Sequence, residues 1–325
     1  MAKADRLFDR RTSEIERMLG VFANAGVESR YACVPLQWYE RPCGWAEKNR
    51  LYLDNAVALL EQASLEALAA AGLEVGDIDG LVAVSTTGLA TPSLDALLME
   101  RLGLRRDAWR LPVFGLGCAG GVLGLARAAQ MAQAAPNERI LFLVVELCTL
   151  TFRRTDQSKS NIIATALFGD GAAAAVVGCT GDGPGLTCWG EYCWPGSLEV
   201  MGWRVEDDGL GVLFSRDIPA LVRTELRTAA DAFLARHRLS LRDIDGFCCH
   251  PGGAKVVAAL EEAFGLPEGA MAEARAVLRD YGNMSAATVL FVLERLLDRR
   301  APGRHLMSAL GPGFTVGFLT LETAG

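Results

Sequence analysis

The chain has 325 residues, of which 51% are hydrophobic and 22% charged, a composition that excludes a disordered protein and fits two domains or one duplicated unit. Its formal net charge of −7 includes no block of Lys and Arg, which argues against nucleic-acid or anionic-membrane partners and favours small molecules. No stretch approaches the roughly 18 apolar residues of a membrane span, and the charged start lacks a secretory signal, which predicts a cytoplasmic protein without stable membrane insertion.

The first half of the chain predicts helices that alternate with buried strands. Apolar residues at helical spacing over 52–71 predict a helix, and the turn DIDG at 77–80 leads into an apolar strand at 80–86. Further helices are expected at 92–103 and 119–134, and further strands at 110–115, 139–146 and 172–178. This alternation favours a largely parallel sheet covered by helices.

The second half repeats the order of the first. Residues 226–253 run from a helical stretch through a second DIDG, at 243–246, into another buried strand. Helices near 253–264 and 285–298 and strands at 305–310 and 313–321 complete a second unit, again with a largely parallel sheet.

Glycine and proline mark the boundary between the two units. The run CTGDGPG places it near 179–185, which divides the chain into an N-terminal unit of residues 1–180 and a C-terminal unit of residues 181–325. The Trp- and Gly-rich segment 188–214 interrupts the alternation and is expected to form an irregular cover over a pocket.

Nine cysteines without a CxxC pair predict reduced thiols rather than disulfides or a metal site. Among them, Cys118 stands between four glycines in FGLGCAGG, where the helix of 119–134 begins. The positive end of that helix would lower the thiol pKa, and the glycines would admit a substrate close to the backbone. The alternative is that a small residue permits close packing there, which is the commoner role of a buried cysteine.

A neighbouring base would favour a nucleophile, and three histidines are available. His237 ends a charged helical stretch and His305 begins an apolar strand, which favours solvated and structural roles. His250 ends the buried strand GFCC, so its ring should project from the carboxyl edge of a sheet, where α/β proteins bind ligands. Asn283 is either a helix cap or an amide donor beside His250. Cys, His and Asn together can carry an acyl group and stabilise an enolate.

Five motifs resemble, in order and spacing, those of type III polyketide synthases, the chalcone-synthase-like enzymes. They are GCAGG around Cys118, ALFGDGAAA at 166–174, HPGG at 250–253, GNMSAA at 282–287 and GPGFTV at 311–316. The resemblance covers about residue 15 to the C-terminus. It implies a thiolase-like α/β fold of two duplicated halves in a five-layer αβαβα arrangement, in agreement with the repeated DIDG.

The same resemblance implies roles for the three candidate catalytic residues. Cys118 would carry the acyl group, while His250 and Asn283 would hold the thioester carbonyl of malonyl-CoA during decarboxylation. It also implies that Phe168 walls the junction between a CoA tunnel and an acyl cavity. Val212 stands where chalcone synthases carry a second Phe, which would widen the cavity mouth.

The segments ELCTLTF, EVMGW and DDGLGVLFSRDIP resemble bacterial synthases of alkylresorcinols and alkylpyrones, which take long acyl starters. Cys148 is then interpreted as a wall residue rather than a second nucleophile, because no base adjoins it. The cavity residues expected from the resemblance are Phe168, Val212, Thr86, Thr87, Thr91, Cys148, Leu150, Thr151, Gly202 and Ser285.

Coenzyme A contacts are implied at Arg17, Gly252 and Lys255, and no cofactor is implied besides the CoA thioester substrates. The pair Thr91-Pro92 matches a loop that reaches into the neighbouring cavity in relatives, so a homodimer is expected. Family members usually begin some tens of residues earlier with a strand, so the N-terminal sheet is expected to lack one central strand.

The expected reaction is the decarboxylative Claisen condensation of an acyl-CoA starter with malonyl-CoA, followed by closure to an alkylpyrone or alkylresorcinol. One alternative is a β-ketoacyl carrier-protein synthase of the third kind, which condenses once and typically follows its His with QxN rather than PGG. The other is a non-catalytic thiolase-like binding protein, against which the presence of Cys118, His250 and Asn283 argues.

Overall fold

A computed structural model describes residues 20–324, and the first half of this range forms one mixed sheet with its covering helices. The strand order is β2-β1-β3-β4, with β1 parallel to β2 and β3, and β4 antiparallel to β3. In chain order, with η marking short non-α helical turns, its elements are α2 (Gly20–Asn24), η2 (Leu36–Glu40), α3 (Trp45–Ala71), η3 (Val75–Asp77), β1 (Gly80–Val84), α4 (Leu94–Leu102), β2 (Trp109–Val113), η4 (Gly117–Ala119), α5 (Gly120–Ala134), β3 (Ile140–Leu147), η5 (Cys148–Thr151), α6 (Lys159–Leu167) and β4 (Asp170–Val177).

The second half forms another four-stranded sheet, of order β5-β10-β9-β8, and a separate hairpin of β6 and β7. Its elements are β5 (Gly185–Cys193), β6 (Met201–Glu206), β7 (Gly209–Phe214), α7 (Ile218–Leu221), η6 (Val222–Leu226), α8 (Arg227–Arg236), η7 (Leu241–Asp243), β8 (Gly246–Cys249), α9 (Ala254–Phe264), α10 (Ala272–Tyr281), η8 (Ser285–Ala287), α11 (Thr288–Asp298), β9 (Gly303–Gly311) and β10 (Thr315–Thr323).

The second sheet is not largely parallel, so that prediction is correct for the first half only. Strand β8 is parallel to β9, but β10 is antiparallel to both β9 and β5. The reason is the connection: residues 312–314 alone join β9 to β10, and a turn of this length can link only antiparallel strands.

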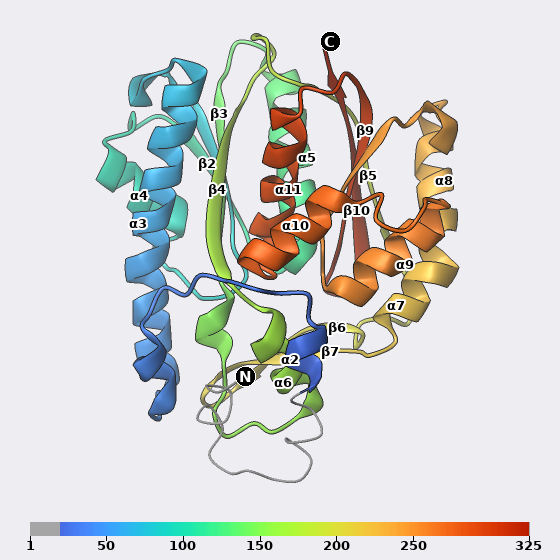
Figure 1. Ribbon diagram of the computed structural model, residues 1–325. Coiled ribbons are helices and arrows are strands. Elements are labelled where there is room, and N and C mark those ends of the chain that lie inside the picture. Colours follow the sequence, from blue (N-terminus) through green and yellow to red (C-terminus); the bar gives the residue numbers. More distant parts are fainter. Residues whose placement is uncertain (1–19, 325) are drawn as a thin grey trace.

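The two sheets alternate with three layers of helices (Figure 1). Helices α3 and α4 cover the outer face of the first sheet, α5 and α11 lie between the sheets, and α8 and α9 lie outside the second. This is the five-layer αβαβα arrangement of two α/β halves that the sequence predicts. The expected boundary at residues 180 and 181 falls between the end of β4 and the start of β5.

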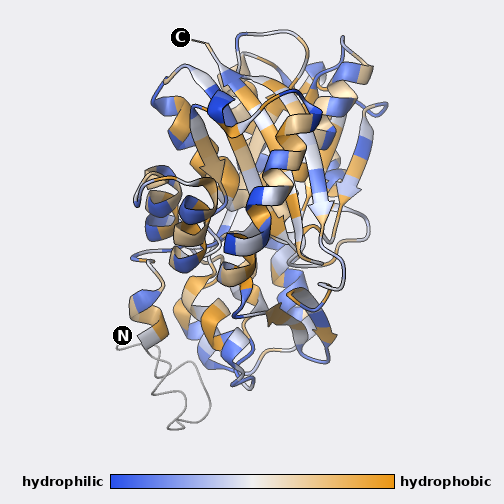
Figure 2. Ribbon diagram, turned by 90° about the vertical axis from the view of Figure 1, so that its right-hand side faces the viewer, coloured by the Kyte–Doolittle hydropathy of each residue, from blue (hydrophilic) through white to orange (hydrophobic). Residues whose placement is uncertain are grey.

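The central strands form where they do because both of their faces are covered. Every residue of β1 and β3 is buried, as expected for the continuous apolar runs of strands between two helical layers. Figure 2 shows apolar residues concentrated on the strands between the helices. Helix α3 ends at Ala71, and the next residue, Gly72, caps it with a φ of +65°, a left-handed conformation that glycine adopts readily.

Two segments differ from the sequence expectation. Residues 188–214 are not irregular, because they supply most of β5 and the β6–β7 hairpin, although Met201 and Phe214 of that hairpin do line a cavity. Helix α10, which was not predicted, occupies the stretch between α9 and Asn283. Within the described residues, β4 pairs with β3 alone, so the first sheet has an edge where the second has β5.

Candidate active site

Cys118 lies in the turn η4, directly before the central helix α5. The turn forms because Gly117 adopts a φ of +47°, a left-handed conformation that favours glycine. A Cβ on Gly117 would meet the ring of Pro312, and a Cβ on Gly121 would meet the carbonyl oxygen of Ala286. The interpretation that these two glycines admit a substrate is therefore wrong: they make room for neighbouring protein segments.

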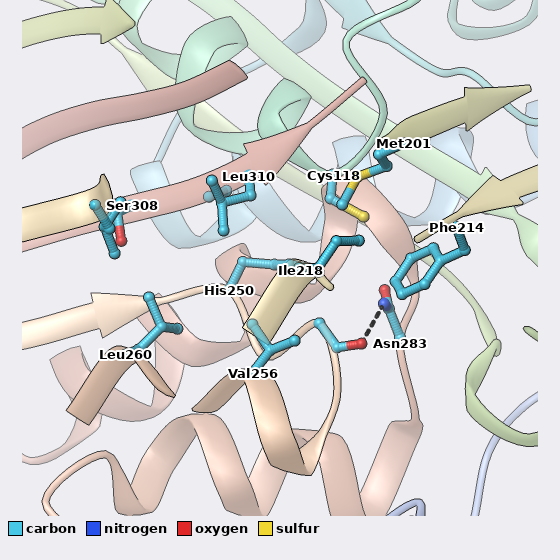
Figure 3. Close-up of a pocket in the computed structure, with 13 residues that line it drawn as sticks. Cys118, Met201, Phe214, Ile218, His250, Val256, Leu260, Asn283, Ser308 and Leu310 are labelled. Atoms are coloured by element: carbon cyan, nitrogen blue, oxygen red, sulfur yellow. Dashed lines mark hydrogen bonds between the residues drawn. The ribbon is translucent and has the colours of Figure 1, made fainter. Parts of the chain in front are cut away.

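His250 and Asn283 come from the second half and meet Cys118 there. His250 directly follows β8, and Asn283 lies between α10 and the turn η8. All three side chains line one cavity of about 20 Å³ (Figure 3), which offers room for about one water-sized group if a water needs roughly 10–15 Å³. The structure thus brings the three predicted catalytic residues together around a space the size of a carbonyl group.

The two donors differ in how firmly they are held. Asn283 is fully buried; its Nδ2 donates to the carbonyl oxygen of Gly252 at 3.2 Å, and its Oδ1 accepts from the backbone N–H of Ser285 at 2.8 Å. Neither ring nitrogen of His250 has a hydrogen-bond partner among the described residues. Burial lowers the pKa of His250 to about 3, so the imidazole is neutral at pH 7 and offers one free N–H to a ligand.

Burial dominates the electrostatics of Cys118. Burial is the main cause that raises the pKa of the thiol to about 12; the nearby Glu146 carboxylate also acts to raise this pKa, and hydrogen bonds with Ser285 and Asn283 act to lower it. The expectation that the start of α5 would yield a lowered pKa is therefore wrong, because loss of hydration outweighs the helix dipole at this buried position.

Glu146, near the end of β3, belongs to the site although it was not predicted. Its side chain is fully buried; Oε2 accepts from the backbone N–H of Thr86 at 3.0 Å and from the hydroxyl of Thr87 at 2.8 Å, and Oε1 accepts from the hydroxyl of Ser285 at 3.3 Å. Burial raises its pKa to about 7 despite these three donors. A glutamate inside the apolar run ILFLVVEL was the signal that could have revealed it.

The hydroxyls of Thr86 and Thr87 bind protein groups rather than an open space. Thr86 Oγ1 accepts from the backbone N–H of Gly117 at 3.1 Å, and Thr87 Oγ1 accepts from the backbone N–H of Leu147 at 2.9 Å. Neither residue lines the cavities described here. Together they tie the end of β1 to the nucleophile's turn and to Glu146, so they position the site from behind.

A second cavity, of about 100 Å³, is lined by residues of the first half and by Val212 of the second. It brings together four of the predicted cavity residues, Phe168, Val212, Cys148 and Thr151. Sequence reasoning missed the rest of the lining, which is mostly apolar and includes Arg30, Ala32, Leu36, Tyr39, Phe152, Ala164 and Thr165. The volume leaves room for several methylene-sized groups on the scale of roughly 10–15 Å³ for one water.

Phe168 lines the second cavity and lies next to Asn283, which lines the catalytic one. The chain on either side of it pairs with Asn283: the Asn283 N–H donates to the carbonyl of Leu167 at 2.8 Å, and the Gly169 N–H donates to the carbonyl of Asn283 at 3.0 Å. The ring of Phe168 packs edge-on against Trp203 of β6. Phe168 therefore lies between the second cavity and Asn283, and its role as the wall between a CoA tunnel and an acyl cavity stays a prediction.

A third cavity, of about 300 Å³, adjoins the catalytic one on the other side. The two share Phe214, Gly252 and Val256 as lining residues. Three cationic side chains line the third cavity: the predicted Lys255, and Lys159 and Arg216, which sequence reasoning missed. Such a mouth suits an anionic ligand that reaches the catalytic cavity past Phe214.

The remaining predicted residues lie apart from these cavities or outside the described range. Leu150 packs in the core between α3 and the first sheet. Gly202 pairs with Leu213 in the β6–β7 hairpin, and Thr91 is exposed in the loop before α4. Arg17 lies outside the described residues. Ser285 contacts Cys118 directly, because the thiol donates to its hydroxyl oxygen at 3.7 Å.

Two features are absent from the residues that the structure describes. No group of three His, Cys, Asp or Glu side chains among them is placed to hold a metal ion. None of their helices is long and apolar enough to cross a membrane.

Matches to known proteins cover almost the whole chain and indicate one family. Residues 43–181 match the family model "Chalcone and stilbene synthases, N-terminal domain", and residues 185–324 match the corresponding C-terminal domain. A "Putative chalcone synthase" of Bacillus subtilis is 38% identical over 326 residues, covering 95% of this chain and 89% of the relative. A "1,3,6,8-tetrahydroxynaphthalene synthase" of Streptomyces peucetius is 42% identical over 308 residues, covering 92% of this chain and 81% of the relative.

The crystal structure of the 1,3,6,8-tetrahydroxynaphthalene synthase of Streptomyces coelicolor, a bacterial type III polyketide synthase, superimposes with a TM-score of 0.93 at 28% identity. The match covers 100% of this chain and 93% of that one. The chain therefore belongs to the chalcone and stilbene synthases and is a type III polyketide synthase, an enzyme that condenses acyl-CoA substrates.

Proposed function

We propose that this synthase condenses a long-chain acyl-CoA starter with malonyl-CoA and closes the product to an alkylpyrone or an alkylresorcinol. The observation that carries the proposal is the second cavity, whose surface is mostly apolar and is lined by residues that include Cys148, Phe168 and Val212. An apolar space of this kind stabilises an alkyl chain by burial, at about 0.8 kcal/mol for each methylene.

In the proposed reaction, Cys118 attacks the thioester carbonyl of the starter, forms a bond from sulfur to the acyl carbon, and releases coenzyme A. The cavity beside it is too small for more than the reacting carbonyl, because its volume is about 20 Å³. In the proposal, the alkyl chain extends past Phe168 into the second cavity.

His250 and Asn283 then serve the extender. Malonyl-CoA loses carbon dioxide, and the electron pair of the broken C–C bond becomes an enolate whose charge lies on the thioester oxygen. The free N–H of the neutral His250 and the Nδ2 of Asn283 face the same cavity as Cys118 and can donate to that oxygen. Fixed donors in a water-poor cavity stabilise such a charge strongly. The enolate carbon attacks the acyl thioester on Cys118, and repetition extends the chain.

Coenzyme A would occupy the third cavity. Lys159, Arg216 and Lys255 line its mouth and supply positive charge for the phosphates, and Gly252 lies where the pantetheine arm would pass toward Cys118. The proposal needs no cofactor besides these thioester substrates. We also propose a homodimer, because the loop at Thr91 leaves Leu89 49% exposed in the single chain.

A second candidate product is 1,3,6,8-tetrahydroxynaphthalene, the compound in the names of three Streptomyces relatives. The 42% identity to one of them favours it. A naphthalene ring system without an alkyl chain would leave the second cavity without a substrate chain to bind.

Mass spectrometry of the products separates these candidates. The enzyme is incubated with malonyl-CoA alone, and with malonyl-CoA plus acyl-CoA thioesters of increasing chain length. We expect alkylpyrones or alkylresorcinols whose yield rises with chain length, and no product from malonyl-CoA alone. Formation of a naphthol from malonyl-CoA alone, with no alkylated product, would overturn the proposal, and a single ketoacyl product would favour one-step condensation.

A further inference from the structure

The hairpin of β6 and β7 lines both the catalytic cavity and the second cavity but belongs to neither main sheet. Val212 of β7 lines the second cavity, and Met201 and Phe214, at the base of the hairpin, line the catalytic one (Figure 3). Trp203 of β6 lies opposite Val212 in the strand register, and its ring packs against Phe168. Because β6 and β7 pair only with each other within the described residues, contacts outside the sheets must fix where these side chains lie.

Two cationic side chains contact the turn at the far end of the hairpin. Lys48 of α3 donates through Nζ to the backbone carbonyl of Asp208 at 3.0 Å and to that of Phe152 at 2.8 Å. Arg153 donates through Nε to the carboxylate of Asp208 at 2.6 Å. The turn residue Asp208 is therefore bound through both its backbone and its side chain.

Glycines of β7 let the strand approach both cations closely. A Cβ on Gly209 would lie 3.4 Å from Lys48 Nζ, and a Cβ on Gly211 would lie 3.1 Å from Arg153 Nη1. Side chains alternate between the two faces of a strand, so the glycines face the cations while Val212 faces the second cavity. Contact on one face of β7 therefore sets how far the other face reaches into the cavity.

The burial of Lys48 is offset at this contact. Its side chain is only 5% exposed, and no Asp or Glu of the described residues forms an ion pair with it. Burial lowers its pKa, and the nearby carboxylate of Asp208 acts in the opposite direction. Taking an ammonium group out of water is costly unless hydrogen bonds replace the lost water. For Lys48 these hydrogen bonds go to the hairpin turn and to Phe152.

The base of the hairpin is held separately from its turn. The backbone carbonyl of Met201 accepts from the N–H of Gly313 at 3.2 Å, and that of Phe214 accepts from the hydroxyl of Ser160 at 3.3 Å. Loss of the contacts at the turn should therefore displace Val212 more than the residues at the base. The second cavity would change its shape while the catalytic cavity keeps its own.

We propose that Lys48 and Arg153 are positioning residues for the choice of starter: by holding the turn at Asp208 they fix the hairpin of β6 and β7 and limit the length of acyl chain that the second cavity accepts. Neither residue lines the catalytic, second or third cavity, so both act through Val212 and Trp203. This inference rests on the proposed function, because it places the acyl chain in the second cavity.

The test compares wild type with Lys48→Met, Arg153→Met and the conservative Arg153→Lys. Arg275→Met, which removes an arginine paired with the buried Glu261 outside the hairpin, is the matched control. Amide hydrogen exchange measures opening of residues 201–214, and competition between acyl-CoA thioesters of two lengths measures starter preference. Release of labelled carbon dioxide from malonyl-CoA gives the rate of decarboxylation, and thermal unfolding midpoints identify any variant that fails to fold.

We expect Lys48→Met and Arg153→Met each to speed amide exchange in residues 201–214 by roughly tenfold. Each should also shift the competition toward the longer acyl-CoA by about tenfold. Decarboxylation should stay within about twofold of wild type, because the two cations do not touch the catalytic cavity. Arg153→Lys should restore most of the wild-type preference, and Arg275→Met should alter neither exchange nor preference. A merely structural role would lower the unfolding midpoint without changing the preference.

Unchanged exchange in both folded variants would overturn the inference whatever the starter is, and so would faster exchange with an unchanged preference. If Lys48→Met fails to fold, Asp208→Asn takes its place, because it weakens the ion pair with Arg153 and keeps the backbone acceptor of Lys48.

The proposed function fails by a different result, namely that wild type makes no alkylated product from any acyl-CoA. Preference is then read as the number of malonyl units in the product. Lys48→Met and Arg153→Met should raise that number, and an unchanged number would overturn the inference.

Discussion

The two halves of the molecule share one design in their DIDG turns. Asp79 accepts a hydrogen bond at 2.8 Å from the backbone N–H of Arg139, just before β3, and Asp245 accepts one at 2.8 Å from the backbone N–H of Arg304, at the start of β9. The glycine that follows each aspartate leaves room for a ring, Trp109 beside Gly80 and His305 beside Gly246. The repeat therefore serves packing: it ties neighbouring strands together at the end of the sheet far from the site.

The halves differ at the opposite end, where the chemistry lies. Each central helix begins after a turn that holds a residue at φ +47°, Gly117 before α5 and Ser285 before α11. The next residue is Cys118 in the first half and Ala286 in the second. Duplication therefore supplies two helix starts that face each other. Because the residues at matching positions differ, the first helix start carries the nucleophile Cys118 and the second carries Ser285, which contacts it.

The largest effect should come from removing the difference between Cys118 and Ala286 at the two helix starts. Cys118→Ala makes the first helix start resemble the second and should lower product formation by roughly 10³-fold or more, because no other group can carry the acyl chain. Product mass spectrometry measures the loss. Cys248→Ala, at a buried cysteine of β8, is the control and should retain activity, and product formation unchanged in Cys118→Ala would refute the assignment.

Removing His250 or Asn283, the two donors of the second half, should distinguish malonyl-CoA decarboxylation from acylation of Cys118. His250→Ala and Asn283→Ala should each slow malonyl-CoA decarboxylation by roughly 10²- to 10³-fold, because each removes a donor to the enolate. Release of labelled carbon dioxide gives that rate, and intact mass gives acylation of Cys118, which should change much less. If His250→Ala stops acylation as completely as decarboxylation, His250 acts on the thiol as well.

Buried Glu146 in the first half and buried His250 in the second should have opposite effects on how the free energy of unfolding depends on pH. Burial raises the pKa of Glu146 to about 7. Its contribution to the free energy of unfolding is therefore fully present below pH 4.5 and is lost as the pH rises through 7. His250 has its pKa lowered to about 3, so its contribution is present above pH 6.5 and is lost as the pH falls. Between pH 4.5 and 6.5 each slope approaches about 1.4 kcal/mol per pH unit, with opposite sign.

Urea unfolding at pH 4.5, 5.5 and 6.5 tests this cancellation. Relative to wild type, the free energy of unfolding of Glu146→Gln should rise with pH across this window, and that of His250→Asn should fall. Parallel curves for all three proteins would show that neither group titrates as its burial indicates.

Filling the second cavity should change the starter without stopping the chemistry. Cys148→Phe and Val212→Phe place a ring in the space assigned to the alkyl chain and should reduce use of the longest acyl-CoA by about tenfold. Competition between acyl-CoA thioesters of two lengths measures the shift. Cys179→Phe, on an exposed cysteine, is the control; an unchanged preference in both cavity variants would place the alkyl chain elsewhere.

The smallest effect is expected at the two DIDG turns, which contain Asp79 and Asp245. Asp79→Ala and Asp245→Ala each remove a carboxylate that accepts one backbone hydrogen bond, which should cost about 1 kcal/mol in either half. The partly exposed ion pair of Asp79 with Arg105 should add little to this loss. Urea unfolding provides the comparison, with the exposed Asp182→Ala as control. A loss in one half alone would show that the two turns are not equivalent.

Much of the fold could be predicted because local patterns carry it. The buried strands β1 and β3 and the helices α3 and α5 follow from continuous apolar runs and from helical spacing. The direction of β10 was missed although the short turn at 312–314 specifies it. The form of residues 188–214 was missed because β5 is stabilised by pairing with β10, a partner more than a hundred residues away.

The candidate active site, like the fold, could be predicted from the sequence only in part. Cys118, His250 and Asn283 could be selected from residue type, place in predicted elements and motif order, whereas Glu146 could not be linked to them. Its role depends on Thr86, Thr87 and Ser285, which approach it from β1 and η8. The sign of the thiol pKa shift was also missed, because helix position is visible in a sequence and loss of hydration is not.

The sequence by itself determined the duplicated order of elements and the residue types available for acyl chemistry, since both are written in local periodicity and motif spacing. The tertiary structure decided that the starts of α5 and α11 face each other, which buries Cys118 with Ser285 and Glu146 and leaves His250 neutral. Burial and facing helix starts arise from packing between distant segments, and the charge states of the site follow from that packing.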